Sequence, residues 1–313
     1  MKPIVTLTIN PTIDLATSVA EVTPEHKLRC EPERRDPGGG GLNVARVIRE
    51  LGGESLALYP RGGSTGDLLE KLLEQKGLRR WPITISGHTR ENITVTEKKS
   101  GREFRFVMPG PTLTEAEWQL CLDSLSTVAA DVEYIVASGS LAPGMPVDFY
   151  ARVARIAKKQ NARLVLDTSG EPLRAGLAEG VFFAKPNRRE FRDMMGTQTD
   201  DPAALAEASR RFLEQGKAEI LVVSMGADGA VLSTREGQYR AVPPPVKTAS
   251  SVGAGDSFVG GMTLGLARGL PPHEAFRWGI ASGTAALMSQ GTDLCRREDA
   301  ERLVTQVQPT RLS

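Results

Sequence analysis

Short apolar runs of strand length recur along the whole chain, and stretches with helical spacing separate several of them. The runs are Ile4–Ile9, Ser55–Tyr59, Tyr134–Ser138, Leu164–Asp167, Phe182–Lys185 and Ile220–Ser224. The helical stretches are Asn43–Leu51, Leu68–Lys76, Tyr150–Ala157, Pro202–Gln215 and Pro272–Ser289. Strands that are apolar on both faces and alternate with helices indicate a parallel sheet covered on both sides. We therefore expect a doubly wound α/β domain, with ligands gathered at the carboxyl ends of the strands.

Two segments do not follow this alternation. Pro11–Cys30 and Glu91–Val107 carry short strands with polar alternation, and Lys98–Arg102 is typical of a hairpin tip. We expect them to form a small antiparallel β lid, with an apolar face that a second subunit covers in a homodimer. The predicted division assigns residues 11–35 and 88–109 to this flap, and residues 1–10, 36–87 and 110–313 to the main α/β domain.

Composition limits the classes of partner. Of the 313 residues, 40% are hydrophobic and 25% charged, which is ordinary for a globular protein. The net charge is +1, so no overall field favours nucleic acid or an anionic membrane, and no apolar stretch is long enough to span a bilayer. Three widely spaced cysteines and an N-terminus without a signal peptide's apolar core predict a protein of the reducing cytoplasm.

The run Gly253-Ala254-Gly255-Asp256 carries the strongest chemical signal, because a helical pattern follows it directly. A helix N-terminus offers unpaired N–H donors and the positive end of a dipole. A carboxylate there would repel a bound phosphate, but it suits a base that takes a proton from a hydroxyl while the N–H groups hold a phosphoryl group in transfer. The alternative is that Asp256 simply caps the helix, and this run alone does not decide between the two.

Four successive glycines precede a second helix, in Pro37-Gly38-Gly39-Gly40-Gly41-Leu42-Asn43. Such a run costs conformational entropy, which predicts that the backbone comes very close to something else. A polyhydroxylated ligand lying on the bare backbone, with Asn43 bonding its hydroxyls, fits this pattern. A flexible linker is the alternative, although linkers rarely lead straight into a well-patterned helix. The run does not complete the dinucleotide-binding fingerprint, because Asn43 occupies the position of its last glycine.

Asn187 and Glu190 lie three residues apart at an expected helix start. Two oxygen-bearing side chains beside a phosphate could hold a hydrated Mg²⁺. Taken by itself, the spacing favours a capping box, in which Asn187 caps and Glu190 reaches back, and both interpretations can share one geometry.

The segment Ser224–Ala230 ends a strand and starts a hairpin, and its glycines would let a nucleotide lie against the backbone, as would a simple turn. Asp14, Lys27 and Arg90 lie in the two flap segments, where each by itself is an ordinary surface charge.

These residues together resemble the ribokinase-like (PfkB) carbohydrate kinases over nearly the whole chain. The first glycine signature of that family matches Gly39–Ala45, with later glycines at Gly52 and Gly62. The second matches Gly253–Asp256 followed by Gly260-Gly261, and Asn187-x-x-Glu190 stands between the two. The resemblance implies ATP-dependent phosphorylation of a sugar phosphate. Phe104–Gly110 and Pro243–Lys247 resemble the family's 6-phosphofructokinases most, which implies conversion of fructose 6-phosphate to fructose 1,6-bisphosphate.

The resemblance also implies roles for individual residues. Asp256 would be the general base, and the backbone of Gly253, Ala254 and Gly255 the anion hole. The implied sugar-phosphate residues are Asp14, Lys27, Gly39, Gly40, Gly41, Asn43, Arg90 and Ser140. The implied ATP residues are Lys185, Asn187, Ser224, Gly226, Gly229, Thr248, Ile280 and Thr284, with Glu190 helping to place Mg²⁺. A K⁺ site is implied near Ser250, Val252, Ala286, Ser289 and Gly291, although many relatives carry Asp where this chain has Ser250.

Two alternatives remain open at this point. Within the same class, the substrate could be tagatose 6-phosphate or fructose 1-phosphate. From another class, the protein could be a sugar-phosphate sensor without catalysis, but a sensor has no need of a base such as Asp256 behind a glycine pair.

Overall fold

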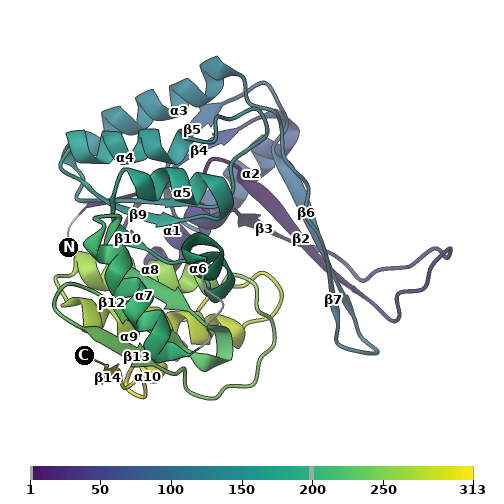
Figure 1. The fold of residues 1–313 in the computed structure, drawn as a ribbon. Helices are drawn as coiled ribbons and strands as arrows, with labels where there is room; N and C mark the ends of the chain where they lie inside the picture. Colours follow the sequence, from purple (N-terminus) through teal and green to yellow (C-terminus); the bar gives the residue numbers. More distant parts are fainter. Residues whose placement is uncertain (1–2, 197–200, 313) are drawn as a thin grey trace.

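A ten-stranded sheet forms the centre of the protein, and a four-stranded sheet projects from it, in the computed structural model that describes residues 3–196 and 201–312 (Figure 1). Within the large sheet, neighbours from β11 to β5 run parallel, and the three strands at the other edge run antiparallel. The spatial order is β14 (Thr310–Arg311), β13 (Gln238–Ala241), β12 (Ala230–Ser233), β11 (Ala218–Ser224), β10 (Val181–Ala184), β9 (Arg163–Asp167), β8 (Tyr134–Ser138), β1 (Ile4–Leu7), β4 (Leu56–Arg61) and β5 (Arg79–Thr84).

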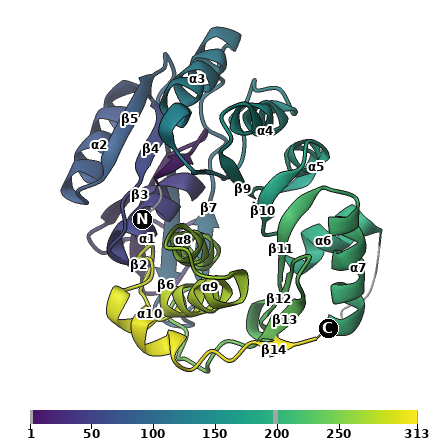
Figure 2. The same ribbon diagram turned by 90° about the vertical axis from the view of Figure 1, so that its left-hand side faces the viewer.

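Helices cover both faces of this sheet (Figure 2). One face carries α1 (Gly40–Glu50), α8 (Ala254–Ala267), α9 (Pro272–Leu287) and α10 (Arg297–Val304), with α2 (Gly63–Gln75) beside α1. The other carries α3 (Glu115–Val128), α4 (Phe149–Lys159), α5 (Gly170–Ala178), α6 (Arg188–Met195) and α7 (Pro202–Glu214). Among the helices described, none combines the length and the apolar character that crossing a membrane requires.

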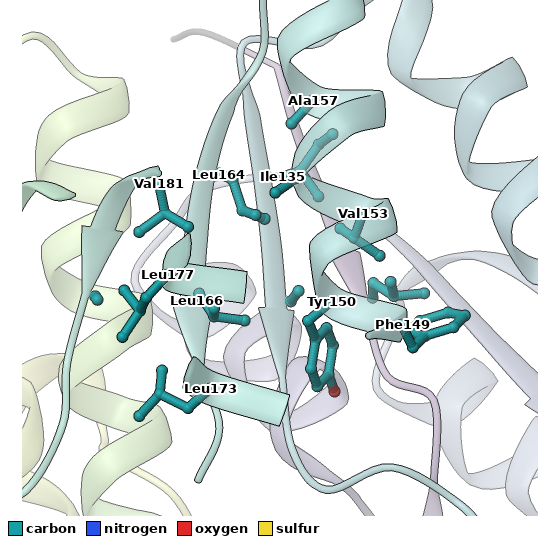
Figure 3. Packing of buried hydrophobic residues seen from close by; sticks show 14 of the residues in the cluster. Ile135, Phe149, Tyr150, Val153, Ala157, Leu164, Leu166, Leu173, Leu177 and Val181 are labelled. Carbon is teal, nitrogen blue, oxygen red and sulfur yellow. The ribbon is translucent and has the colours of Figure 1, made fainter. Parts of the chain in front are cut away.

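The central strands are apolar on both faces because both faces are buried. In β8, Ile135 and Ala137 join the core beneath α3 to α7, whereas Tyr134 and Val136 join the core beneath α8 and α9. Strand side chains alternate between faces, so a strand between two helical layers needs apolar residues at every position. Figure 3 shows the first of these cores, where Ile135 lies near Val153 of α4. The predicted doubly wound α/β fold is confirmed.

Two helices begin three or more residues earlier than the apolar spacing indicates. The helix predicted from Asn43 begins at Gly40, and the helix predicted from Leu68 begins at Gly63. The first turn of α2 is built from glycine and small polar residues, and that of α1 has two glycines and a single apolar residue, Leu42, so neither shows an apolar periodicity. The start of α1 within the glycine run also shows that this run is not a flexible linker.

The flap consists of β3 (Arg34–Gly38), β2 (Thr12–Val19), β6 (Arg90–Glu97) and β7 (Glu103–Phe106), in that spatial order. Its outer pairs are antiparallel, as expected, and the predicted hairpin tip joins β6 to β7. The central pair differs, because β2 and β6 are parallel. Strand β2 follows β1 and β6 follows β5, and the parallel pairing means that both run in the same direction away from the main sheet (Figure 1).

The order of the strands places a crevice beside β1. The chain builds from β1 outward through β4 to β5, then returns to β8 on the other side of β1 and continues outward to β11. Ligands of open α/β sheets bind at such a switch point, outside the carboxyl ends of the strands. The flap strand β2 starts at this same place, five residues after β1 ends at Leu7.

Candidate active site

A cavity of about 290 Å³ lies between the flap and the carboxyl end of the main sheet. Four stretches that are far apart in the sequence meet in its walls, around residues 12–14, 39–43, 90–94 and 252–256. The sequence-predicted residues among its lining are Asp14, Gly39, Gly40, Asn43, Arg90, Val252, Gly253 and Asp256. The fold therefore brings the two glycine signatures together, as the hypothesis of a single site requires.

Asp256 is not the N-cap of helix α8. The cap is Gly253, whose φ of 72° is left-handed, and Asp256 is the third residue of the helix. A side chain at position 253 would also collide with Leu294, so glycine is required there twice over. No side chain caps this helix, so the N–H groups of its first turn stay available to an anion. The capping alternative for Asp256 is therefore wrong.

The surroundings of Asp256 favour a carboxyl group that exchanges a proton near neutrality. Burial raises its pKa, and the negative charge of Asp167 raises it further. A hydrogen bond from Asn43 Nδ2 to Asp256 Oδ2, 2.8 Å long, and the charge of Lys185 oppose this rise. The balance sets the pKa of Asp256 to about 7, where a group serves well as a general base.

Asp167 is a site residue that the sequence analysis missed. It ends strand β9, and its Oδ1 lies 3.2 Å from Nζ of the buried Lys185, which follows β10. Burial alone would lower the pKa of Lys185, but Asp167, Asp256 and Glu190 together outweigh it, so the pKa is raised and the amine stays charged. An acidic residue at the end of a buried parallel strand was the available signal, since such ends meet at one edge of the sheet.

The Asn187–Glu190 pair forms a capping box at the start of α6. Asn187 Oδ1 accepts from the N–H of Glu190 at 2.9 Å, and Glu190 Oε2 accepts from the N–H of Asn187 at 2.8 Å. The capping interpretation is thus confirmed, while a role of Glu190 toward Mg²⁺ stays a prediction. One oxygen of each side chain is used by the cap, which leaves the second Glu190 oxygen as the candidate ligand.

Some of the residues predicted to bind ATP lie at the ends of β10 and β11, and the others lie in the hairpin that follows β11, in the segment before α8 and in α9. Asn187 and Ser224 are bridged across the ends of β10 and β11, and the predicted hairpin follows, with Gly226 in open space. Gly229, however, packs against the backbone of Ala241. Thr248 is exposed, whereas Ile280 and Thr284 are buried in α9, where the Thr284 hydroxyl donates to the carbonyl of Ile280 at 2.7 Å.

Three predicted substrate residues lie away from the cavity. Gly41 faces strand β1, because a side chain there would come within 2.5 Å of the Leu7 carbonyl oxygen. Gly40 is similarly close to Gly139 after β8, so this glycine run lets α1 pack tightly on the sheet as well as lining the cavity. Ser140 is exposed beside the lining residue Gly139. Lys27 is exposed in the loop 20–33, which extends along the flap away from the main sheet (Figure 1).

The flap side of the cavity is held by hydrogen bonds around Asp14. Asn92 Nδ2 donates to Asp14 Oδ1 at 3.0 Å, while Asn92 Oδ1 accepts from the N–H of Met108 at 3.1 Å. Burial raises the pKa of Asp14, and the Asn92 bond opposes the rise. Arg90 donates to the carbonyls of Met108 at 2.6 Å and Asn10 at 3.0 Å. Asn92 and the cavity-lining Arg105 were also missed, because their neighbours in sequence are ordinary strand residues.

The oxygens near the predicted K⁺ site are uncharged. Ser250 Oγ accepts from the N–H of Val252 at 3.2 Å, and Ser289 Oγ donates to the carbonyl of Leu294 at 2.9 Å. Val252, Ala286 and Gly291 offer only backbone carbonyls. Rings of backbone carbonyl oxygens bind K⁺ in channel filters, so these carbonyls have the right chemistry for the ion without a carboxylate, and the K⁺ site stays a prediction.

The described residues contain no group of three or more His, Cys, Asp or Glu side chains that would form a metal cage by itself. Mg²⁺ in phosphoryl-transfer sites is commonly held by one or two carboxylates, water and the substrate phosphates. Asp167 and Glu190 are of the right chemistry for that arrangement, because both influence Lys185 at the same edge of the sheet.

Comparison with known proteins identifies the class. Residues 4–299 match the model of the pfkB family carbohydrate kinases, and the chain belongs to this family. It is 46% identical over 303 residues to an ATP-dependent 6-phosphofructokinase isozyme 2 of Mycobacterium tuberculosis, covering 96% of this chain and 89% of the relative. The isozyme 2 of Escherichia coli is 40% identical over 304 residues, covering 97% and 98%.

Solved structures agree with this assignment. Phosphofructokinase-2 from Escherichia coli in complex with potassium has a TM-score of 0.93 and 39% identity, covering 98% of this chain and 99% of that one. The same enzyme in complex with fructose-6-phosphate has a TM-score of 0.90 and 38% identity, with the same coverage. Its tetrameric inhibited form has a TM-score of 0.91 and 38% identity, again with that coverage.

Proposed function

We propose that this protein transfers the γ-phosphoryl group of ATP to fructose 6-phosphate and forms fructose 1,6-bisphosphate. The observation that carries the proposal is the half-buried Asp256, with a pKa of about 7, in the first turn of α8, whose N–H groups no side chain caps, at a cavity of substrate size. The 6-phosphofructokinases among the relatives support the choice of sugar.

In the proposed reaction, Asp256 accepts the proton of the sugar hydroxyl as that oxygen attacks the γ-phosphorus of ATP. The bond from the γ-phosphorus to the bridging oxygen breaks, and ADP leaves. The N–H groups of Gly253, Ala254 and Gly255 stabilise the charge on the phosphoryl oxygens during transfer. Asp14, Gly39, Gly40 and Asn43 hold the sugar hydroxyls, while Lys185 contributes a fixed positive charge next to the base.

Mg²⁺, when bound, would neutralise phosphate charge, and Asp167 and Glu190 would hold it through water. K⁺ would occupy the carbonyl oxygens near Val252, Ala286 and Gly291 and so steady the loop before α8. Ser224, Asn187 and Gly226 form the edge along which the nucleotide lies. These assignments, the residues of the sugar-phosphate site and the predicted cytoplasmic location are our proposals.

Steady-state kinetics with three sugar phosphates test the proposed function directly. We expect the highest kcat/KM with fructose 6-phosphate, ahead of fructose 1-phosphate and tagatose 6-phosphate. A higher value for either of the other two would reassign the substrate within the family. Binding of sugar phosphate without turnover of ATP would instead support the sensor alternative.

The pKa of Asp256 predicts how activity depends on pH. A general base works only when deprotonated, so kcat/KM should fall as the pH drops through the pKa of the free enzyme. With that pKa at about 7, the acidic limb of the profile should have its midpoint near pH 7 rather than near the ordinary value of 3.8. A profile that stays flat from pH 8 down to pH 5 would contradict the assignment of Asp256 as the base.

We also propose that the flap is a distinct unit, formed by residues 11–35 and 88–109, that joins two chains into a homodimer. Phe106, Val107, Met108 and Leu28 expose 53, 68, 41 and 38% of their surface, respectively, and all four belong to the flap. Phe106 and Val107 also line the cavity. Four strands in one layer have no second layer to cover these side chains, whereas a second copy can supply one. Strand β3 continues to Gly38, so the flap joins the main domain without a linker there.

The dimer is expected to persist at micromolar concentration in multi-angle light scattering. Val107→Asp places a charge on the most exposed of these residues and should shift the protein toward monomers, whereas Val147→Asp changes a similarly exposed residue outside the flap and should not. A fully active monomer at high micromolar concentration would overturn the proposal.

A further inference from the structure

The side-chain amide of Asn43 is bonded at both ends. Its Nδ2 donates to Asp256 Oδ2 at 2.8 Å, and its Oδ1 accepts from Arg46 Nη1 at 3.0 Å. Asn43 and Arg46 lie three residues apart in α1, so both side chains lie on the same side of the helix. The catalytic base is therefore connected through a single amide to a guanidinium group that the sequence analysis did not single out.

Arg46 is buried and held in place by groups other than the base. Its side chain is 8% exposed, and its Nη1 also donates to the carbonyl of Pro37 at 2.6 Å. Asp36 lies 3.8 Å from Nη2 and balances its charge. Asp36 is itself fixed by the Thr292 hydroxyl, which donates to its Oδ2 at 2.7 Å. The guanidinium thus has little freedom to move away from Asn43.

An arginine fixes the orientation of an adjacent side-chain amide. Because the guanidinium has N–H donors and no acceptor, the amide has to turn its oxygen, and not its NH₂ group, toward it. With Asn43 Oδ1 bound to Arg46, the NH₂ group has to face Asp256. The reversed amide would place its oxygen against the Asp256 carboxylate and its NH₂ group against the guanidinium, so both contacts would be repulsive. Hydrogen bonding to the charged form of a carboxylate favours that form, so the orientation of this amide bears on the protonation of the base.

We propose that Arg46 is a positioning residue that holds the Asn43 amide in the orientation that donates to Asp256, and so favours the deprotonated form of the base. The proposal rests on the proposed function for the part that Asp256 plays in catalysis. Arg46 is absent from the residues that line the cavity, so it acts through Asn43 and not on the substrate.

Other charges also act on these two groups and have to be separated from the effect of Arg46. Asp256 is influenced by Asp167 on β9, Lys185 after β10 and Asp14 on β2, as well as by Asn43. Arg46 itself is influenced by Asp36, Asp14, Asp293 and Arg34. Loss of Arg46 therefore removes a positive charge from the region in addition to releasing the amide, and the experiment has to distinguish the two effects.

A double-mutant cycle makes this distinction. Arg46→Met should move the acidic midpoint of the kcat/KM profile upward by about 0.5 to 1 pH unit, the scale on which a single hydrogen bond shifts a carboxyl pKa. Asn43→Ala should move the midpoint in the same direction. In the Asn43→Ala background, Arg46→Met should add no further shift, because the amide that transmits its effect is gone.

The control is Arg49→Met. Arg49 lies three residues after Arg46 on the same helix and is exposed. Both arginines line a second cavity, of about 280 Å³, which is distinct from the candidate site and also has Lys76 and Asp293 in its walls. The Arg49→Met substitution removes an equal charge without changing the contacts of the Asn43 amide. The acidic midpoint of its kcat/KM profile should therefore stay within about 0.2 pH units of the wild type. An unshifted midpoint in Arg46→Met, or a full shift that persists in the Asn43→Ala background, would overturn the proposal.

A second readout keeps the test independent of activity and of a folding failure. The Cγ resonance of Asp256, identified in ¹³C spectra by its loss in Asp256→Asn, should titrate with the same upward shift in Arg46→Met. Arg46→Lys retains the charge, but its single nitrogen replaces both Nη1, which binds Asn43 and Pro37, and Nη2, which lies near Asp36, so it should shift the midpoint by part of that amount. If Arg46→Met does not fold, Arg46→Lys decides the test, and an unshifted midpoint in Arg46→Lys would contradict the proposal. If the Asp256 Cγ resonance shows the expected upward shift in Arg46→Met but the wild-type protein has no kinase activity, the proposed function is wrong and the positioning role of Arg46 still holds.

Discussion

Replacing Asp256 by asparagine is expected to lower kcat by at least about 10²-fold, the scale of losing a general base, while the affinity for both substrates changes little. Asn has nearly the same shape as Asp and can still accept a hydrogen bond from Asn43, which lies 2.8 Å from Asp256 Oδ2. The helix start is unaffected, because Gly253 is the cap. Steady-state kinetics and binding titrations on the same preparation separate the two effects.

The same Asp256→Asn variant, which should lower activity, is expected to raise the stability of the folded protein at alkaline pH. Folding raises the pKa of Asp256 from 3.8 to about 7, so the unfolded chain releases this proton at lower pH than the folded protein does. Ionised Asp256, which is partly desolvated, therefore lowers the stability of the folded protein. This loss of stability is absent below about pH 4, grows as the pH rises, and is complete above pH 7. Asp256→Asn should raise Tm at pH 8 and leave it unchanged at pH 4. Turnover near that of the wild type, with or without this gain, would show that Asp256 is not the base.

Arg90→Ala is expected to lower kcat/KM for fructose 6-phosphate by roughly 10 to 150-fold, the equivalent of one charge-assisted contact worth about 1.5–3 kcal/mol. Arg90 lines the cavity from the flap side, and its Nε has no hydrogen-bond partner within the described structure. A protein of net charge +1 needs dedicated cations to hold a dianionic phosphate, and the planar guanidinium suits phosphate oxygens. Unphosphorylated fructose should be affected far less.

The structure also supplies the competing explanation for Arg90. Its bonds to the carbonyls of Met108 and Asn10 tie the end of β7 to the segment after β1, so its removal could loosen the flap. An equal loss with fructose and with fructose 6-phosphate would mean that this tie is the whole function of Arg90. Arg102→Ala, at the exposed hairpin tip of the flap, is the matched control and should leave both substrates unaffected.

The central sheet was predictable because burial on both faces leaves a direct trace in the sequence. The strand Tyr134–Ser138 has the predicted bounds, since apolar residues fill all but its last position and a core lies on each side. The direction of β2 relative to β6 left no such trace. Pairing between segments nearly eighty residues apart depends on where each strand leaves the main sheet, and the alternation of their side chains is the same for either direction.

The candidate site was predictable where a glycine-rich run directly precedes a residue with a reactive side chain, as at Gly253 and Asp256. It was not predictable where a residue matters through its neighbours in space. Asp167 and Arg46 look like an ordinary strand end and an ordinary helix charge until β9, β10 and α1 come together. Gly41 shows the converse, because a residue inside a conspicuous motif is needed there for packing against β1 rather than for contact with a ligand.

The place of β1 in the sheet has a consequence for how the chain folds during synthesis. Strand β1 lies between β4 and β8, and its partner β8 begins at Tyr134. A nascent chain that has emerged only as far as β5 can pair one side of β1 but leaves the other side as an open hydrophobic edge. Such edges recruit strands from other chains, so translational pausing before residue 138 should favour aggregation, and Asp256 reaches Asn43 only after most of the protein has been made.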